Sequence, residues 1–244
     1  MKIIISPAKK MNKKPYTIIP TIPMFNERAN KLASLIKEYE IGDLQKAFKC
    51  SNKIAQQVFE MYKNFGKVTH PALFLYDGIQ YKNIDVTTLE KKEIAFLNKN
   101  LFIADSLYGL LRPTDLISPY RLDFNTKFSF VNIANYRDQL RNILTSPVIN
   151  LCSKEFGALL PPEKTITIHF LQKIKGITKS YSTYTKMERG RFVRYLAKKG
   201  DTSMQTLFSY SDNGYTLDRK NSTEKNIIYI ASHFQSLEGI SKDK

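Results

Sequence analysis

The alternation of apolar and polar residues at positions 165–171 restricts the fold more than any other feature of the sequence. Ile166, Ile168 and Phe170 fall on one side of an extended chain, and the residues between them, including Thr167 and His169, fall on the other. This pattern predicts a strand with one buried face. A Lys-Gly pair at 175–176 leads into the segment 178–184, which predicts the second arm of a β-hairpin or meander. The chain must therefore build a sheet.

Further strands and several helices are spread unevenly along the chain. Apolar runs predict buried strands at 1–5, 101–104, 148–151 and 227–231, and helical spacing of apolar residues predicts helices at 26–39, 43–49, 51–65, 89–98 and 185–199. The first helix places Leu32, Leu35, Ile36 and Tyr39 on one face, whereas the apolar segment 74–80 has no clear period. Because these elements come in unequal clusters rather than regular βαβ units, we expect one α+β domain, residues 1–244, with a central β-sheet flanked by helices.

The charge of the chain is strongly positive and unevenly placed. The 244 residues include 38 Lys and Arg against 22 Asp and Glu, a formal net charge of +16. Most of the basic residues are Lys, which has AT-rich codons, so the total alone is weak evidence for a nucleic-acid partner. The segment 173–199 is more informative, since it holds nine basic residues and one acidic residue. Its positive field favours an anionic partner.

Several classes of protein are excluded by what the sequence lacks. No apolar run approaches the ~18 residues of a membrane span, and the apolar stretch after Met1 is too short for a secretory signal. We therefore expect a cytoplasmic protein without a membrane partner, and the high positive charge favours a monomer. Cys50 and Cys152 cannot form a disulfide framework, and His70, His169 and His233 stand alone in the sequence, so we expect neither a metal nor a cofactor.

Residues 106–122, S-L-Y-G-L-L-R-P-T-D-L-I-S-P-Y-R-L, form a dense motif after a predicted strand. Tyr108, Arg112, Asp115, Tyr120 and Arg121 all fall in this loop. One interpretation is structural, because an Arg–Asp ion pair can hold a large loop. The other is functional, because guanidinium groups on a pocket wall bind anions well.

A second motif, Y-S-T-Y-T-K-M-E-R-G-R-F-V-R-Y-L, spans residues 181–196. Lys186, Arg189 and Arg194 gather on adjacent faces of the predicted helix. Gly190 in a helix interior costs about 1 kcal/mol relative to Ala, so it indicates close approach of a backbone or a phosphate. The segment is either a solvated basic helix or an anion site, and the concentration of scarce Arg favours the anion site.

A third segment joins two short predicted helices at a tight connection, residues 49–52. This spacing is close to that of a helix-hairpin-helix, which binds a DNA phosphate with backbone N–H groups. Lys46, Lys49 and Lys53 would supply the positive charge, although the hairpin lacks the usual glycines. The alternative is an ordinary helical corner.

Four motifs together resemble the bacterial YaaA family of peroxide stress proteins. They are I-S-P-A-K at 5–9, the motif at 106–122, V-I-N-L-C-S-K-E-F at 148–156 and K-M-E-R-G-R-F-V-R at 186–194. They occur in the family's order and span most of the chain. The segment 74–81, F-L-Y-D-G-I-Q-Y, departs from the family pattern, so no role is carried over to it.

The resemblance implies a cytoplasmic protein of the oxidative-stress response that limits free intracellular iron. It also implies binding of duplex or bubble DNA through a basic cleft with a helix-hairpin-helix, led by phosphate contacts with little reading of bases. It implies no catalytic residue. We expect phosphates to bind at the following residues: Lys9, Lys46, Lys49, Ser51, Asn52, Lys53, Arg112, Arg121, Lys186, Arg189, Gly190 and Arg194. We expect a pocket to include Ser6, Tyr108, Asp115, Tyr120, Asn150, Ser153 and Glu155.

The residues themselves leave a second function open. An enzyme acting on a nucleotide or another phosphorylated small molecule would use a pocket lined by Ser6, Lys9, Arg112, Arg121, Lys186 and Arg189. Asp115 or Glu155 would then be the candidate acid or base. A deep, closed pocket would favour this enzyme, and a long open cleft would favour DNA binding. Direct iron binding is disfavoured by the scattered His and Cys residues.

Overall fold

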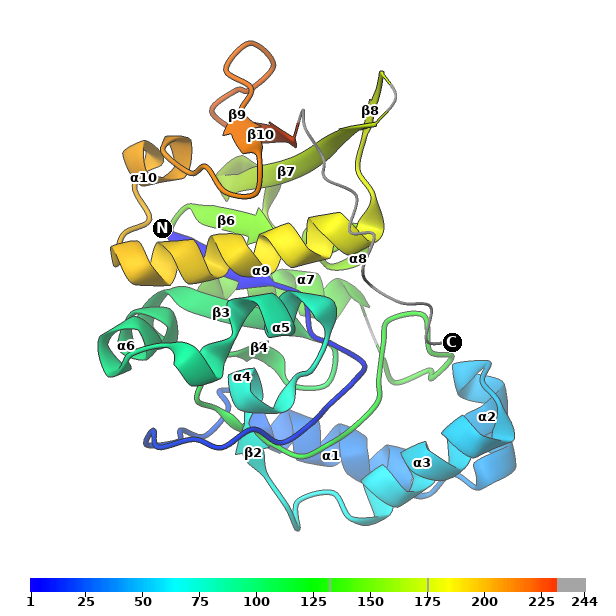
Figure 1. Cartoon of the computed structure of the whole chain (residues 1–244). Helices are drawn as coiled ribbons and strands as arrows, with labels where there is room; N and C mark the ends of the chain where they lie inside the picture. The colour runs from blue at the N-terminus through cyan, green and yellow to red at the C-terminus, as the bar shows by residue number, and fades with distance from the viewer. Residues whose placement is uncertain (132, 175, 232–244) are drawn as a thin grey trace.

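Eight strands form a mixed sheet at the centre of the molecule (Figure 1). The computed structural model describes residues 1–131, 133–174 and 176–231. The order across the sheet is β4-β3-β1-β6-β7-β10-β9, with β8 paired to β7. The strands are β1 (Lys2–Ile5), β3 (Leu101–Asp105), β4 (Gly109–Leu111), β6 (Val148–Leu151), β7 (Thr165–Ile174), β8 (Ile177–Lys179), β9 (Tyr215–Leu217) and β10 (Asn226–Ala231). A separate small sheet pairs β2 (His70–Pro71) with β5 (Leu116–Ile117).

The inner strands β3, β1, β6, β7 and β10 run parallel, and β4, β8 and β9 pair antiparallel with their neighbours. Helices cover both faces of a parallel sheet, so its central strands are apolar throughout. Ile3, Ile4 and Ile5 of β1 are accordingly fully buried, with Ile3 and Ile5 in one core cluster and Ile4 in another. The predicted α+β architecture, a central sheet flanked by helices, is confirmed.

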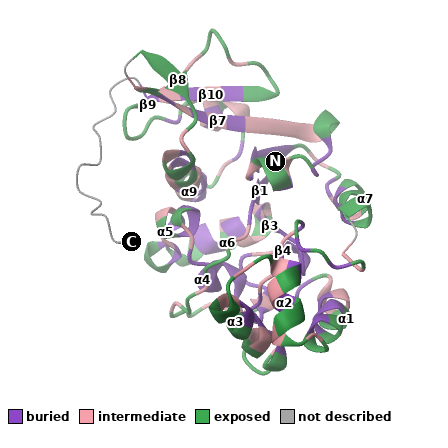
Figure 2. Cartoon of the chain, turned by 90° about the vertical axis from the view of Figure 1, so that its right-hand side faces the viewer, coloured by how far each residue is buried: buried purple, intermediate pink, exposed green. Residues whose placement is uncertain are grey.

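The helices divide between the two faces and one end of the sheet. They are α1 (Asn26–Lys37), α2 (Ile41–Phe48), α3 (Asn52–Lys63), α4 (Ala72–Leu75), α5 (Ile79–Ile84), α6 (Lys91–Asn100), α7 (Ile133–Ile143), α8 (Lys154–Gly157), α9 (Ser182–Lys199) and α10 (Met204–Phe208), with 3-10 turns at Val86–Thr88 and Pro162–Lys164. Helix α9 packs on α5 and β7, and α7 packs near β4 on the opposite face. Helices α1, α2 and α3 lie together at the end away from β8–β10, with α2 and α3 showing much exposed surface (Figure 2).

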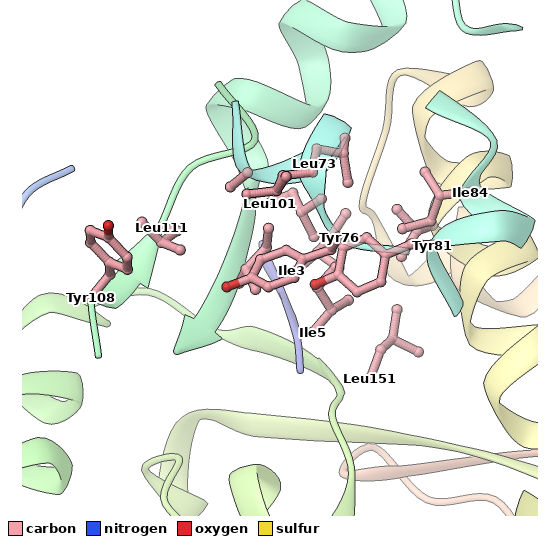
Figure 3. Close-up of a cluster of buried hydrophobic side chains, with 14 of the residues drawn as sticks. Ile3, Ile5, Leu73, Tyr76, Tyr81, Ile84, Leu101, Tyr108, Leu111 and Leu151 are labelled. Carbon is pink, nitrogen blue, oxygen red and sulfur yellow. The ribbon is translucent and has the colours of Figure 1, made fainter. Parts of the chain in front are cut away.

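Two tyrosines connect the helices after β2 to the sheet. Figure 3 shows Tyr76 and Tyr81 against Ile3 and Ile5 of β1. The Tyr81 hydroxyl donates to the carbonyl oxygen of Ser6 at 2.8 Å, and the Tyr76 hydroxyl donates to the buried carboxylate of Asp105 at 2.5 Å. The first bond ties α5 directly to the residue that follows β1. This connection positions one wall of the site described below.

The structure corrects several local predictions. Helix α2 begins at Ile41 rather than at Asp43, with Gly42 inside it and Glu40 as its N-cap. Leu35 of α1 is 41% exposed, because Ala29 and Ala33 fill the buried face instead. The strand predicted at 178–184 is limited to Ile177–Lys179, since α9 begins at Ser182. The segment 74–80 contributes to two short helices, α4 and α5.

The other predicted elements are close to their observed positions. The strands at 1–5, 101–104, 148–151 and 227–231 are confirmed as β1, β3, β6 and β10, and the alternating strand at 165–171 is confirmed as the first part of β7. The β-hairpin is also confirmed, since β8 pairs antiparallel with β7. His233 lies outside the described residues.

Candidate functional site

A cavity of about 400 Å³ lies where β1 and β6 end. These strands are parallel neighbours, with Ile5 opposite Leu151, so the residues that follow them emerge at the same edge. In parallel sheets, ligands bind at the carboxyl ends of adjacent strands whose connections lead to opposite sides. Strand β1 is at such a position, because β3 lies on one side of it and β6 on the other. The cavity is lined by Ser6–Met11, Gly78–Tyr81, Tyr120–Asp123, Ser153, Glu155, Phe156, Lys186 and Arg189.

Two serines fix the strand ends to each other. Ser6 donates through Oγ to Ser153 Oγ at 3.2 Å, and the same Ser6 oxygen accepts the Ser153 backbone N–H at 2.8 Å. Asn150 supports this corner from behind, because its Oδ1 accepts the Cys152 backbone N–H at 2.9 Å. Ser6 and Ser153 line the cavity, as the sequence predicts for a pocket, whereas Asn150 does not belong to its lining.

Three polar side chains of the cavity wall have a buried nitrogen without a partner. Across the described ranges 1–131, 133–174 and 176–231, the buried side-chain atoms without a hydrogen-bond partner are Gln80 Nε2, Arg121 Nε and Arg189 Nε. All three residues line this one cavity, although they come from α5, the loop after β5 and α9. A buried donor without an acceptor costs free energy, and a buried cation without an anion costs more. Burial lowers the pKa of Arg189 accordingly.

Two carboxyl groups, those of Asp123 and Glu155, also line the cavity. Asp123 forms an ion pair with Lys9, with Lys9 Nζ 2.9 Å from Asp123 Oδ2. The pKa of Glu155 is raised, chiefly by burial and then by the negative charge of Asp123, with Lys9 opposing the shift. Glu155 therefore takes up a proton more readily than an ordinary glutamate, which suits an acid or base role.

A more open groove adjoins the cavity. It is lined by Lys9, Lys10, Met11, Lys53, Gln56, Gln57, Glu60 and Met61, so the segment 9–11 belongs to both hollows. Lys53 and its neighbours lie on α3, so the groove runs from the end of β1 toward that helix. Lys9 and Lys10 are both exposed, and Lys10 is 3.3 Å from Asp77.

The motif at 106–122 has one part that holds the fold together and another part that lines the cavity. Arg112 is paired with Asp115, with Nε–Oδ1 and Nη2–Oδ1 distances of 3.0 and 2.9 Å. The fully buried Asp115 carboxylate also accepts the Arg112 backbone N–H at 2.7 Å and the Thr21 hydroxyl at 2.6 Å. The ion-pair interpretation therefore describes this part of the loop, and neither residue lines the cavity. Tyr108 also lies elsewhere, with its hydroxyl accepting the Ser118 N–H, whereas Tyr120 and Arg121 do line the cavity.

The basic helix α9 divides in the same way. Lys186 and Arg189 line the cavity, but Arg194 donates to the carbonyl oxygens of Ile84 and Asp85, at 3.0 Å each. These carbonyls are at the end of α5, so Arg194 caps that helix. At Gly190 the close approach is that of a backbone, because an added Cβ would lie 2.2 Å from the carbonyl oxygen of Gln80.

Two backbone N–H groups of the helical corner at 49–52 are already hydrogen-bonded to carbonyl oxygens of α2. The N–H groups of Lys49 and Cys50 donate to the carbonyls of Lys46 and Gln45, which closes α2 with Lys49 in the left-handed conformation. These two groups are thus committed to the end of α2. Ser51 is the N-cap of α3, directly before Asn52. Lys46 and Lys49 line a separate hollow with Cys50, whereas Lys53 lies in the groove beside the cavity.

The sequence interpretation missed Gln80, Tyr81, Lys10 and Asp123. Gln80 is the last residue of the aperiodic segment 74–80 and Tyr81 follows it directly, so no spacing signals their position. Lys10 and Asp123 directly follow the motifs at 5–9 and 106–122, so their closeness in sequence to Ser6 and Arg121 is the signal that could have indicated them.

The described part of the chain offers neither an activated thiol at Cys152 nor a cluster of metal-ligating side chains. Burial raises the pKa of the Cys152 thiol to about 12, which opposes thiolate formation at neutral pH. In residues 1–131, 133–174 and 176–231 there is no group of three or more His, Cys, Asp and Glu placed to hold a metal ion. None of the helices in these ranges is both long enough and apolar enough to cross a membrane.

Comparison with known proteins identifies the family. A family model described as peroxide stress protein YaaA matches residues 1–221. This chain belongs to the YaaA family. Its YaaA relatives include a UPF0246 protein of Finegoldia magna, 36% identical over 242 residues, covering 95% of this chain and 98% of the relative. A UPF0246 protein of Lactobacillus johnsonii is 33% identical over 244 residues, covering 94% and 97% of the two chains, and one of Rickettsia peacockii is 31% identical over 249 residues, covering 95% and 100%.

Proposed function

We propose that this YaaA-family protein acts in the peroxide-stress response, that it binds DNA through phosphate contacts, and that it limits free intracellular iron. The peroxide-stress role follows from the family. The binding face would be the mouth of the cavity together with the groove along α3.

The observation that carries this proposal is the shared segment 9–11. Lys9 and Lys10 belong to both hollows, Lys186 stands at the cavity and Lys53 at the groove, so exposed lysines follow one another across this surface, with Asp123 beside Lys9 and Asp77 beside Lys10. Long, exposed lysines suit a phosphate backbone without reading bases, and each contact releases counterions. Binding would therefore fall steeply as salt concentration rises.

The effect on iron would be indirect. The described residues offer no three-ligand cluster of His, Cys, Asp and Glu, and iron is held in proteins by such clusters. Calorimetric titration of the purified protein with Fe(II) under anaerobic conditions tests this part. Tight stoichiometric binding would contradict it.

Fluorescence anisotropy with duplex, bubble and single-stranded DNA over a range of salt tests DNA binding. The informative variant is Lys53→Glu with Lys186→Glu, because both side chains are exposed and neither holds the fold together. A matched control is Lys91→Glu with Lys198→Glu, at the first residue of α6 and in the last turn of α9. We expect the first pair to weaken binding about tenfold or more and to reduce the salt slope by about two, whereas the control pair changes little. Equal effects of both pairs would contradict a located binding face.

A second function, an enzyme acting on a nucleotide or another phosphorylated small molecule, is favoured by one observation. Five of the six residues expected to line its pocket do line the cavity, Arg112 being the exception, and Glu155 is there with a raised pKa. A panel of nucleotides and sugar phosphates would raise the melting temperature if this function is correct. Turnover of a stabilising compound should then be lost in Glu155→Gln. A panel without any stabilising compound would contradict the enzyme.

A further inference from the structure

We propose that Gln80, Arg121 and Arg189 form a site for a terminal phosphate, the phosphate monoester of a nucleotide that is either free or at the end of a DNA strand. This inference deepens the proposed function by adding a separate end-binding site, and it rests on DNA binding only where the ligand is a strand end.

The three donors come from separate parts of the fold. Gln80 belongs to α5, Arg121 to the loop after β5 and Arg189 to α9, and all three line one cavity. Each has a buried nitrogen without an acceptor in the described chain, and Gln80 as a whole is only 7% exposed. Three independent costs of this kind at one place are best explained by a shared acceptor that the ligand brings. Guanidinium groups and an amide donor match the oxygens of a phosphate.

The charges favour a monoester over the diester of a DNA backbone. Among the cations of the cavity, Lys9 is paired with Asp123 and Lys10 with Asp77. Arg121, Arg189 and the exposed Lys186 have no carboxylate partner in the described residues, and the two arginines, each with a buried Nε that lacks an acceptor, together carry two positive charges. A terminal phosphate carries about −1.5 to −2 at pH 7, whereas an internal phosphodiester carries −1. The terminal phosphate therefore neutralises the pair more completely.

The surroundings leave room for the rest of a nucleotide. The cavity volume of about 400 Å³ is within the usual range for small-molecule sites. Met11, Ile79 and Phe156 add apolar surface to its wall, where a base or sugar can pack. Met11 also lines the adjoining groove, so a strand lying along α3 would reach the cavity with its end.

The bond between α5 and β1 supports a preformed site. Tyr81 is the residue after Gln80, and its hydroxyl donates to the carbonyl oxygen of Ser6 at 2.8 Å. On the other side, Gly190 is the residue after Arg189 and packs against Gln80 itself. Tyr81 thus ties α5 to the end of β1, and Gly190 brings α9 against Gln80, so Gln80 and Arg189 are held in place before binding, which reduces the ordering cost.

The test compares single-stranded oligonucleotides that differ only at their ends. A 12-mer with a 5′-phosphate, the same 12-mer with a 3′-phosphate and one with hydroxyl groups at both ends are labelled internally and titrated by anisotropy. Adenosine monophosphate and inorganic phosphate serve as competitors. The variants are Arg121→Gln, Arg189→Gln and Gln80→Leu, with Lys53→Gln as the matched control in the groove, and melting temperatures verify that each is folded.

We expect one phosphorylated end to bind about tenfold or more tighter than the hydroxyl ends, and adenosine monophosphate to compete. Both arginine variants should abolish this preference, and Lys53→Gln should weaken all oligonucleotides equally. Equal binding of all three oligonucleotides, with no effect of either competitor, would overturn the inference. The proposed DNA binding would then be judged separately, by the affinity for the oligonucleotide with hydroxyl groups at both ends. Binding of adenosine monophosphate that depends on the arginines, without binding of any oligonucleotide, would support the site with a free nucleotide and contradict the DNA function.

Discussion

Gly190 of α9 meets Gln80 of α5 so closely that a Cβ atom at position 190 would lie 2.2 Å from the carbonyl oxygen of Gln80. The same atom would lie 2.8 Å from Cβ of Asn83. No side chain fits between the two helices at this point. Since Gln80 and Arg189 both line the cavity, the spacing of α5 and α9 also sets the spacing of the site.

Gly190→Ala should therefore destabilise the protein and disturb the site. The obstructing atom is a backbone oxygen, so the helices must separate, which costs on the order of 1–3 kcal/mol of unfolding free energy. Urea unfolding measures this change. Gly42→Ala is the control, because Gly42 lies inside α2 with nothing within 4 Å of an added Cβ. That substitution should leave stability unchanged or raise it by up to about 1 kcal/mol; equal losses in both variants would contradict the close contact as the cause.

Glu188, one residue before Arg189, should make stability depend on pH. Its carboxyl group is 1% exposed, accepts from the Tyr210 hydroxyl and pairs with Arg191 at 3.4 Å. Burial raises its pKa from 4.5 to about 7, against the opposing effects of Tyr210 and Arg191. The native state thus holds a proton that the unfolded chain has lost, so the unfolding free energy falls as pH rises from 4.5 to about 7 and is level above it.

Glu188→Gln should remove this part of the pH dependence. The difference in unfolding free energy between the native protein and the variant should change by about 3 kcal/mol from pH 4.5 to pH 7.5. Chemical unfolding at a series of pH values gives the two curves. Glu163→Gln, at an exposed position, should follow the native curve. Parallel curves for the native protein and Glu188→Gln would show that Glu188 titrates as an ordinary carboxyl group.

The Arg112–Asp115 pair should matter for stability and not for phosphate binding. Asp115→Ala leaves the Arg112 backbone N–H and the Thr21 hydroxyl without their buried acceptor, so we expect a loss on the order of 3–5 kcal/mol. Asp43→Ala removes the exposed pair with Lys46 and should cost less than about 1 kcal/mol. Arg112→Gln should retain the full preference for phosphorylated ends, because Arg112 does not line the cavity. Loss of that preference would place Arg112 in the binding site after all.

Local sequence patterns predicted the elements that depend on neighbours in the chain. The continuous apolar run of β1 reflects burial on both faces of the strand, whereas the alternation at the start of β7 reflects burial on one face. Both patterns follow directly from the spacing of apolar residues in the sequence. The β8 strand was predicted too long, to residue 184, because α9 begins at Ser182, three residues before the predicted start of that helix. The exposure of Leu35 was missed because alanines at 29 and 33 fill the same helix face, and tertiary packing alone decides between them.

The site was predicted only in part for the same reason. The concentration of scarce Arg in α9 correctly drew attention to Arg189, but Arg194, five residues later, faces the end of α5. Arg112 and Arg121 belong to one motif, yet the first is bound by Asp115 and the second lines the cavity. Spacing along the sequence indicates that such arginines lie near one another, but it does not determine which of them pairs with a carboxylate or a carbonyl group. Gln80 could not be predicted, because its role depends on the packing of α5 against α9.

Glu155 should control how tightly the cavity binds an anion as pH changes. Burial and the nearby charge of Asp123 raise its pKa, so it becomes neutral at a higher pH than an ordinary glutamate. The neighbouring groups do not reverse this effect: Lys9 is paired with Asp123, and the pKa of Cys152 is about 12. As pH falls, loss of the negative charge on Glu155 removes a repulsion toward any bound anion.

Sulfate is the probe for this prediction, because its charge remains constant over the pH range in which carboxyl groups titrate. We expect its affinity, measured by calorimetry, to rise about fivefold as Glu155 is protonated. Glu155→Gln should bind sulfate with the higher affinity at every pH, and Asp43→Asn, on α2, should follow the native protein. A pH dependence that persists unchanged in Glu155→Gln would assign the effect to another group, whereas its disappearance would place the bound anion beside this carboxyl.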